Sequence, residues 1–444
     1  MEDFKLRRKI MALAFPAILE MLSGTLVWAT DTAMVGRLSA EALSAVGLGG
    51  QIVFNVVYVF GALGVGALAM VSRSIGAGDK KRADYITSQA FIMAVCLGII
   101  LALIYFFCAE RIYGMLSDDP EVVALGTKYV KILALGVVFM VPSYVLNSAL
   151  RGAGNTVVPM LSAAAGNILN VVGDYVLIFG HFGFPRMEVE GAALASAISQ
   201  IVAALIALIY AGSGRANVAI DFKALIPDFG LMRELTRISL PASMEELSYT
   251  TSRLLCSAWI NRLGTVAFAA HQVAVTGESI SFMPGYGFSV AASAMVGQNL
   301  GANDEKTAEK SAWEAARLAA ILMGMMAILF LLVPEKITGL FTNIPEVRDL
   351  AARCLRIGAL EQVSIAYSMT FSGALRGAGD TKGTFRITSM TWWFLRVPLI
   401  FLVAWFKAGL ELVWVTTVIQ YFVEALLMVR RFKKSEWKKI KMMI

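Results

Sequence analysis

The sequence has few of the groups on which soluble enzymes and metal proteins depend. Only 16% of its 444 residues are charged, and it contains two histidines and four cysteines, none of them in a Cys-x-x-Cys pair. Because a soluble domain is about a quarter charged, this composition argues against a water-soluble fold, a disordered chain and a nucleic-acid-binding protein. The isolated cysteines and the two histidines also argue against a disulfide framework and a zinc module.

Apolar residues are in excess, at 58% of the chain, and the mean hydropathy is +0.69. The stretches 42–72 and 152–173 contain no charged residue. A helix needs about 20 apolar residues to cross a bilayer, and an open sheet cannot satisfy its backbone in lipid. We therefore predict an all-α polytopic membrane protein with twelve transmembrane helices. They are expected near residues 10–36, 46–72, 86–109, 127–150, 157–179, 190–212, 234–259, 270–297, 312–333, 350–375, 384–406 and 409–430.

The distribution of Lys and Arg predicts the orientation in the membrane. With a cytoplasmic N-terminus, 26 of the 39 basic residues fall on the cytoplasmic side, as the positive-inside rule requires. We therefore expect a multi-pass protein of the prokaryotic inner membrane with both termini in the cytoplasm. The basic tail Arg430–Lys441 is expected to face anionic lipid, not nucleic acid, and the first helix is expected to be retained because no cleavage site follows it.

The sequence repeats itself at a fixed offset, which places Pro16 on Pro241. The stretch Pro16–Ser23 matches Pro241–Ser248 at five of eight positions, and Ala149–Thr156 matches Ala374–Thr381 at seven of eight. No gap is needed between these matches, so the chain contains an internal duplication.

The duplication predicts the domain organisation. Each repeat holds six predicted spans, an even number, so both repeats enter the membrane from the same side and form two six-helix bundles related by a pseudo-two-fold axis along the membrane normal. We expect an N-lobe of residues 1–222 and a C-lobe of residues 223–444, with a cleft suited to transport by alternating access. A duplicated scaffold without transport activity is the simpler alternative.

Polar side chains in the first lobe predict a cation site. Asp31 lies in the first predicted span, while Asn170 and Asp174, at positions i and i+4, share one face of the fifth. Ser196 adds a hydroxyl near the start of the sixth. Ionisable groups at bilayer depth mark functional sites by default, and oxygen ligands of this kind suit H⁺ or a hard cation such as Na⁺ at Asp31, Asn170 and Asp174. Alternatively, Asp174 is simply hydrated at a helix end.

The second lobe does not repeat these residues, since Asp31 falls on Cys256. Its own polar residues could bind a cationic substrate or a second ion, or could serve as structural ion pairs and cavity-lining groups. The candidates in this lobe are Glu245, Glu246, His271, Glu278 and Glu361, and those in the first lobe are Glu20, Gln51 and Asn55. Because Glu20 and Glu245 occupy equivalent positions in the two repeats, a packing or hydrogen-bonding role is at least as favoured for them.

The Gly-rich loops predict turns and helix caps. Gly76–Asp79 and Gly301–Asp304 lack the Lys-Ser/Thr of a phosphate-binding loop. The spans suggest no Ser-His-Asp or Cys-His arrangement, and there is no room for a soluble nucleotide-binding domain. The expected activity is therefore secondary transport, without an enzymatic step and without a cofactor beyond the coupling ion.

The motifs of both repeats resemble those of the multidrug and toxic compound extrusion (MATE) family, over nearly the whole chain. This resemblance implies a monomeric, cation-coupled antiporter that expels lipophilic cations and other drugs. A lipid-linked precursor flippase of the same superfamily is the alternative. The motifs are Pro16…Glu20, Asp31-Thr-Ala-Met-Val-Gly36, Gly76-Ala-Gly78, Leu150-Arg-Gly-Ala-Gly154, Ala270-His-Gln272, Phe282-Met-Pro-Gly285 and Gly297-Gln-Asn-Leu-Gly-Ala302.

The resemblance also implies roles for individual residues. In that family the Asp of the first helix, here Asp31, and an Asn-x-x-x-Asp in the fifth, here Asn170 and Asp174, form a cation site. A Thr of the sixth helix completes it, where this chain has Ser196. NorM-type members also use an Asp in the tenth helix, but this chain reads Ile365-Ala-Tyr-Ser368 there. That difference resembles the DinF-like branch and implies coupling in the N-lobe, by H⁺ rather than Na⁺.

Overall fold

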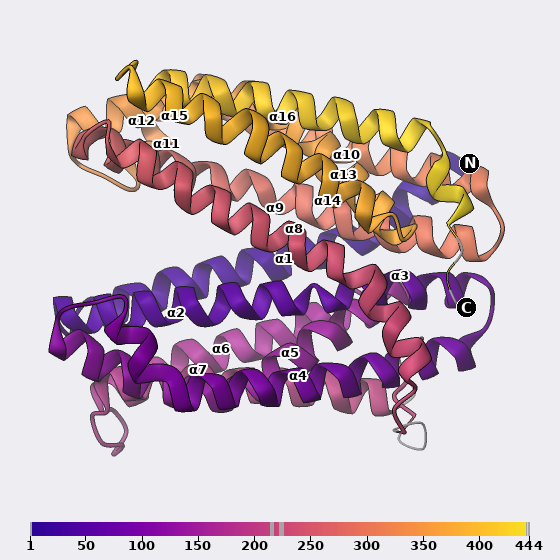
Figure 1. The fold of residues 1–444 in the computed structure, drawn as a ribbon, viewed down its shortest axis with the longest axis horizontal. Helices are drawn as coiled ribbons and strands as arrows, with labels where there is room; N and C mark the ends of the chain where they lie inside the picture. Colours follow the sequence, from indigo (N-terminus) through magenta and orange to yellow (C-terminus); the bar gives the residue numbers. More distant parts are fainter. Residues whose placement is uncertain (1, 214–216, 222–225, 441, 443–444) are drawn as a thin grey trace. The chain divides into compact units, whose positions relative to one another are not determined.

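The computed structural model describes residues 2–213, 217–221, 226–440 and 442, and no strand occurs among them. Each of the twelve predicted spans is helical, which confirms the all-α fold (Figure 1). The helices of the first repeat are α1 (Glu2–Val35), α2 (Ala40–Gly61), α3 (Leu63–Gly76), α4 (Lys80–Gly114), α5 (Pro120–Gly152), α6 (Val157–Phe179) and α7 (Glu188–Gly212). Those of the second are α8 (Phe229–Asn261), α9 (Thr265–Gly301), α10 (Glu305–Leu332), α11 (Pro334–Gly339), α12 (Pro345–Gly358), α13 (Gln362–Gly377), α14 (Thr381–Thr391), α15 (Val397–Trp405) and α16 (Leu410–Lys433).

Nine helical segments among the described residues are long and apolar enough to cross a membrane. The three spans outside this set are α8, α9 and the pair α12–α13. These three contain all five of the acidic and histidine residues predicted for the second lobe. Polar side chains therefore lower the hydropathy where the sequence predicted a polar site.

Three predicted spans are interrupted. The second breaks at Ala62 between α2 and α3, and the tenth contains a 3₁₀ turn, Ala359–Glu361, between α12 and α13. In the eleventh, the segment Trp392–Arg396 forms a π-helical stretch between α14 and α15. Such π segments occur often at functional sites, and this one holds Arg396, a basic residue inside a span.

The duplication extends to the turns that start α4 and α10. Gly78 and Asn303, at equivalent positions, both have positive φ, of 77° and 58°. The next residues, Asp79 and Asp304, each accept a hydrogen bond of 2.9 Å from the backbone amide at position i+3. These caps confirm the predicted turn and capping role of the Gly-rich loops.

The described chain groups into two compact units. The N unit consists of Leu19–Ile75 and Asp79–Ser243, and the C unit of Met1–Ile18, Gly76–Gly78 and Met244–Met442. The chain passes from one unit to the other shortly after Pro16 and again shortly after Pro241, at equivalent repeat positions. The predicted lobe boundary between residues 222 and 223 lies outside the described residues, and the lobe ranges remain a prediction.

Small residues bring helices close together in the core of the C unit. Five alanines on one side of α10 have no exposed surface and belong to a cluster that includes residues of α9, α13 and α16. They are Ala308, Ala312, Ala315, Ala316 and Ala319. Small side chains allow close backbone approach, which is how helices pack in lipid.

The segment between the repeats is anchored on α4 in the N unit. Asp84 accepts a hydrogen bond of 2.6 Å from the amide of Ala219. Gln89 donates to the carbonyl of Ile226 over 2.8 Å and accepts from the amide of Asp228 over 2.9 Å. The described part of the predicted linker is therefore held on the helix and does not run free.

Asp228 caps the start of α8 from this anchored segment. Its carboxylate accepts hydrogen bonds from the amide of Leu231, at 3.1 Å, and from the hydroxyl of Tyr85, at 3.0 Å. These two donors hold the pKa of Asp228 below its ordinary value. The cap and the α4 contact together fix where α8 begins.

The basic tail packs against its own unit. The indole of Trp437 is fully buried and stacks on Phe432 at 4.7 Å. Arg431 donates to Asp380 over 2.8 and 3.1 Å, and Lys438 lies 3.0 Å from Glu309. Burial of Trp437 thus folds the tail onto neighbouring acidic residues, and the expectation that the tail faces anionic lipid stays a prediction.

Candidate functional site

Three of the four predicted cation-site residues meet through one amide group in the N unit. Asp31 comes from α1, Asn170 from α6 and Ser196 from α7. In the orientation that satisfies both neighbours, the Asn170 amide nitrogen donates to the two carboxylate oxygens of Asp31 over 3.0 and 3.1 Å, and its oxygen accepts from the Ser196 hydroxyl over 3.3 Å. The amide therefore links three helices around one carboxylate.

Asp174 lies one turn after Asn170 on α6 and is 1% exposed. Neither of its carboxyl oxygens accepts a hydrogen bond from a donor in the described part of the chain. Its direct neighbour is the carboxyl group of Asp31. Since a buried carboxylate without a donor is costly, this pair is stable when the two groups share a proton or a cation.

Sequence reasoning missed Tyr129 on α5. This side chain is 4% exposed and lies within electrostatic range of both Asp31 and Asp174. An added Cβ at Gly49 of α2 would meet its ring at 2.8 Å, so a glycine makes room for it. A tyrosine in an apolar span carries no charge signal, which is why the sequence did not identify it.

The remaining candidates of the first repeat do not join this group. Glu20 forms an ion pair with Arg151 at the end of α5, at 2.5 Å, and both side chains are mostly buried. On α2, Gln51 is exposed and Asn55 half-buried. The ion pair supports the packing and hydrogen-bonding role that its repeat symmetry favoured, and the Oε2 atom of Glu20 has no hydrogen-bond partner among the described residues.

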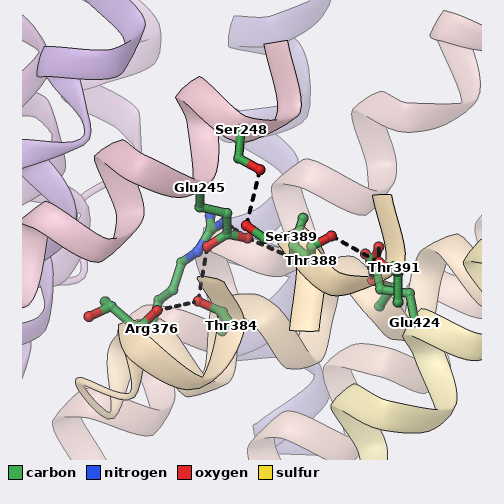
Figure 2. Close-up of polar contacts among 10 residues, drawn as sticks. Glu245, Ser248, Arg376, Thr384, Thr388, Ser389, Thr391 and Glu424 are labelled. Atoms are coloured by element: carbon green, nitrogen blue, oxygen red, sulfur yellow. Dashed lines mark hydrogen bonds and ion pairs between the residues drawn. The ribbon is translucent and has the colours of Figure 1, made fainter. Parts of the chain in front are cut away.

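Glu245 has the equivalent ion pair in the C unit (Figure 2). Arg376 donates to its carboxylate over 2.9 Å, and the hydroxyls of Thr384 and Thr388 on α14 donate over 3.0 and 2.9 Å. Glu245 is 5% exposed, whereas the neighbouring Glu246 is half-buried. Three donors satisfy the Glu245 carboxylate, so it is a structural acceptor.

Glu278 and Glu361 form a buried acidic pair in the C unit. They are 5% and 1% exposed, and their carboxyl groups are direct neighbours. Gln362 donates to Glu278 over 2.9 Å, but the Oε2 atom of Glu361 has no hydrogen-bond partner among the described residues. The ring of His271 is edge-on to that of Trp414, with 6.0 Å between the ring centroids.

Glu424 on α16 is a second residue that the sequence analysis missed. It is 6% exposed and accepts hydrogen bonds from Ser368, Thr391 and Gln420 at 2.6, 2.8 and 2.6 Å (Figure 2). Ser368 belongs to the stretch of the tenth span that lacks a carboxylate of its own. The position was overlooked because the acid comes from α16, far along the chain from the serine that it contacts.

No group of three or more His, Cys, Asp or Glu side chains in the described ranges could hold a metal ion. The predicted acidic residues of the C unit are divided among separate networks and do not form one site. The N unit, in contrast, gathers Asp31, Asn170, Asp174 and Ser196 in one place, as predicted.

Comparison with known proteins identifies the family. A family model described as MatE matches residues 16–176 and 241–402, two segments that begin at equivalent repeat positions. A probable multidrug resistance protein NorM of Thermotoga maritima is 30% identical over 439 residues, covering 98% of this chain and 94% of its own. A multidrug resistance protein MdtK of Yersinia pseudotuberculosis is 28% identical over 393 residues, covering 88% and 86%.

Solved structures share the fold. A MATE protein in complex with MaL6 superimposes with a TM-score of 0.91 at 24% identity, covering 98% of both chains. A MATE protein in the bent conformation has a TM-score of 0.89 at 25% identity, covering 98% of this chain and 97% of its own. The DinF-like placement remains a prediction, because the curated relatives carry the names NorM and MdtK. Since the family model matches most of both repeats, the chain belongs to the MatE family of multidrug and toxic compound extrusion proteins and is a multi-pass membrane transporter, not an enzyme.

Proposed function

We propose that this protein is a secondary active multidrug efflux transporter. It exchanges H⁺ inward for lipophilic or cationic organic compounds outward by alternating access. The names of its relatives support the drug substrates. The buried acidic pair in the N unit supports cation coupling, because an antiporter needs a group that binds and releases the driving ion during each cycle.

The observation that carries this proposal is the carboxyl group of Asp174, which is buried with neither oxygen receiving a hydrogen bond from the described residues. A structural acid would have donors around it, as Glu245 does. Asp174 instead has a second carboxyl group as its neighbour, so the pair binds a proton between them in one state of the cycle. Release of that proton leaves two like charges in contact, which opens the site.

The amide of Asn170 is compatible with either coupling ion, and we propose H⁺ because the carboxyl groups of Asp31 and Asp174 are direct neighbours. With its nitrogen toward Asp31, the amide donates to both carboxylate oxygens. A sodium ion requires the opposite amide orientation, with the oxygen toward Asp31 and the nitrogen donating to Ser196, a contact of 3.3 Å. Sodium coupling thus stays open as the second outcome of the test.

The acidic residues of the C unit differ in how available their carboxyl groups are for binding a cationic substrate. Glu245 is satisfied by three donors and therefore supports the fold. Glu361 retains an oxygen without a partner among the described residues, so we assign the pair Glu278 and Glu361 to a cationic substrate or a second ion. We further propose that both termini are cytoplasmic in the inner membrane, as the basic residues indicate, and that the transporter acts as a monomer.

Dye accumulation in drug-sensitive bacterial cells tests this function. Cells with the wild-type protein should accumulate less of a lipophilic cationic dye than cells without it, and collapse of the proton gradient should abolish the difference. The Asp31→Asn protein should reach the membrane in equal amount yet give no protection. Equal accumulation with and without the wild-type protein would overturn the efflux proposal and favour the flippase alternative.

A further inference from the structure

A hollow lies on the surface of the C unit along the first turns of α10. It has a volume of about 450 Å³ and is lined by three basic residues, three acidic residues and Trp313: Lys306, Lys310, Arg317, Asp3, Glu309 and Glu314. A second groove of about 370 Å³ shares Glu314 and Arg317 with it and includes Arg7 from α1. The two adjoin at Glu314 and Arg317, and we call them together the α10 groove.

Two arginines in the α10 groove converge on one buried acid. Arg7 lies 2.8 Å and Arg317 lies 2.7 Å from opposite oxygens of Glu314. The Glu314 side chain is 7% exposed, whereas those of Arg7 and Arg317 are 53% and 60% exposed. One carboxylate shared by two guanidinium groups leaves this trio with one net positive charge. The other two acids of the hollow have their own partners, since Asp3 pairs with Lys310 and Glu309 with Lys438. Each guanidinium has five N–H donors, so both retain donors for an anion.

The other end of the groove is apolar. It runs along Leu318, Ala320 and Ile321 and reaches Tyr367 on α13. Ile321 is 62% exposed on a helix that is apolar enough to cross a membrane, so this end faces hydrocarbon. A ligand that fits the whole groove therefore needs an anionic head and an apolar tail.

The depth of the two arginines matches that of lipid headgroups. The first and ninth spans were predicted to begin at residues 10 and 312, so Arg7 lies just before one span and Arg317 in the first turns of the other. Basic pockets between transmembrane helices at the interface bind anionic headgroups. Arginine is suited to this because its planar guanidinium binds phosphate through two hydrogen bonds.

We propose that the α10 groove binds an anionic phospholipid of the bilayer. Its phosphate contacts Arg7 and Arg317, and one acyl chain lies along Leu318 and Ile321. Because Arg7 belongs to α1 and Arg317 to α10, the bound headgroup joins the first half of α1 to α10 inside the C unit. This role is independent of the transported substrate.

Native mass spectrometry of the purified full-length protein with added phosphatidylglycerol or phosphatidylcholine tests the proposal. The wild type should retain phosphatidylglycerol, and Arg7→Gln/Arg317→Gln should bind it about thirtyfold more weakly, as the loss of two interfacial basic charges predicts. The control Lys80→Gln/Lys81→Gln removes the same charge from exposed positions of α4 and should leave binding unchanged. Equal retention by the wild type and the arginine variant would overturn the proposal.

A second variant tests the apolar half without removing charge. Ala320→Trp fills the groove while keeping both arginines, so phosphatidylglycerol should be lost to a similar extent. Unchanged binding in Ala320→Trp would contradict the acyl-chain contact. Inorganic phosphate at millimolar concentration should not displace the lipid, and displacement would show that the groove is a site for free anions instead.

Discussion

The guanidinium of Arg151 lies 2.5 Å from the carboxylate of Glu20 and joins the end of α5 to the middle of α1. The same contact recurs at the equivalent positions of the second repeat, between Arg376 and Glu245, at 2.9 Å. The two ion pairs differ in their surroundings, since the Arg151 side chain is 8% exposed and that of Arg376 is 33% exposed. Duplication has thus preserved the ion pair in both repeats, whereas the carboxyl pair of Asp31 and Asp174 occurs in one.

Removing one partner of the more buried bridge should destabilise the protein. Glu20→Gln leaves the Arg151 charge in a site of low exposure without its acid, which costs roughly 3 kcal/mol of unfolding free energy. A double-mutant cycle with Arg151→Gln, measured by thermal unfolding in detergent, should give a coupling energy larger than the same cycle for Glu245 and Arg376. A larger coupling energy for Glu245 and Arg376 would contradict the expectation that the more buried ion pair contributes more to stability.

Replacement of the buried acid of α6 should stop transport without unfolding the protein. Asp174→Asn keeps the size of the side chain but removes the group that takes up the ion, so dye transport should fall by at least about tenfold. Asn170→Ala should be similarly impaired because it removes the bridge between Asp31 and Ser196. Size-exclusion profiles should match the wild type. Normal transport by both variants would show that Asp174 and Asn170 take no part in coupling and that α6 has only a structural role.

The acidic pair of the C unit should matter less for coupling. Glu361→Gln should reduce dye transport only partially and leave the choice of driving ion unchanged, since Asp31 and Asp174 remain. The measurement is the initial rate of dye movement at several dye concentrations, where loss of a substrate contact raises KM. Complete loss of transport in this variant would move the coupling site to the C unit.

Glu424 should be a structural acid. Glu424→Gln replaces one acceptor oxygen of a side chain that receives three hydrogen bonds with a donor nitrogen. Each such bond is worth about 0.5–1.5 kcal/mol, so the melting temperature should fall clearly. Glu411→Gln on the same helix is the matched control. The Glu411 pair with Arg353 is exposed, at 40% and 55%, and such pairs contribute about 0–1 kcal/mol. Equal melting temperatures for the two variants would contradict the assignment.

The features predicted best were those that leave a local pattern in the sequence. Apolar length identified the spans, and the fixed offset identified the repeat. The i, i+4 spacing put Asn170 and Asp174 on one face of a helix, and the family resemblance grouped both with Asp31. The pairing of Glu20 with Arg151 was not predictable, because an ion pair between helices so far apart in the chain leaves no spacing signal. Only its symmetry with Glu245 indicated a structural role.

Features that depend on tertiary packing were missed. Tyr129 has no charge to mark it, and Glu424 lies on a different helix from its partner Ser368, three helices further along the chain. The tail was expected at the lipid surface because of its composition. Burial of Trp437 and the pairing of Arg431 with Asp380 fold it onto the C unit, which composition alone did not indicate.

The most direct test of the central claim is dye movement in proteoliposomes with wild type or Asp31→Asn, under an imposed proton gradient and, separately, an imposed sodium gradient. The account predicts dye movement driven by the proton gradient in the wild type and none in Asp31→Asn, although both proteins are inserted equally. Movement driven by the sodium gradient alone would contradict proton coupling. Undiminished proton-driven movement in Asp31→Asn would contradict coupling at the carboxyl pair of the N unit.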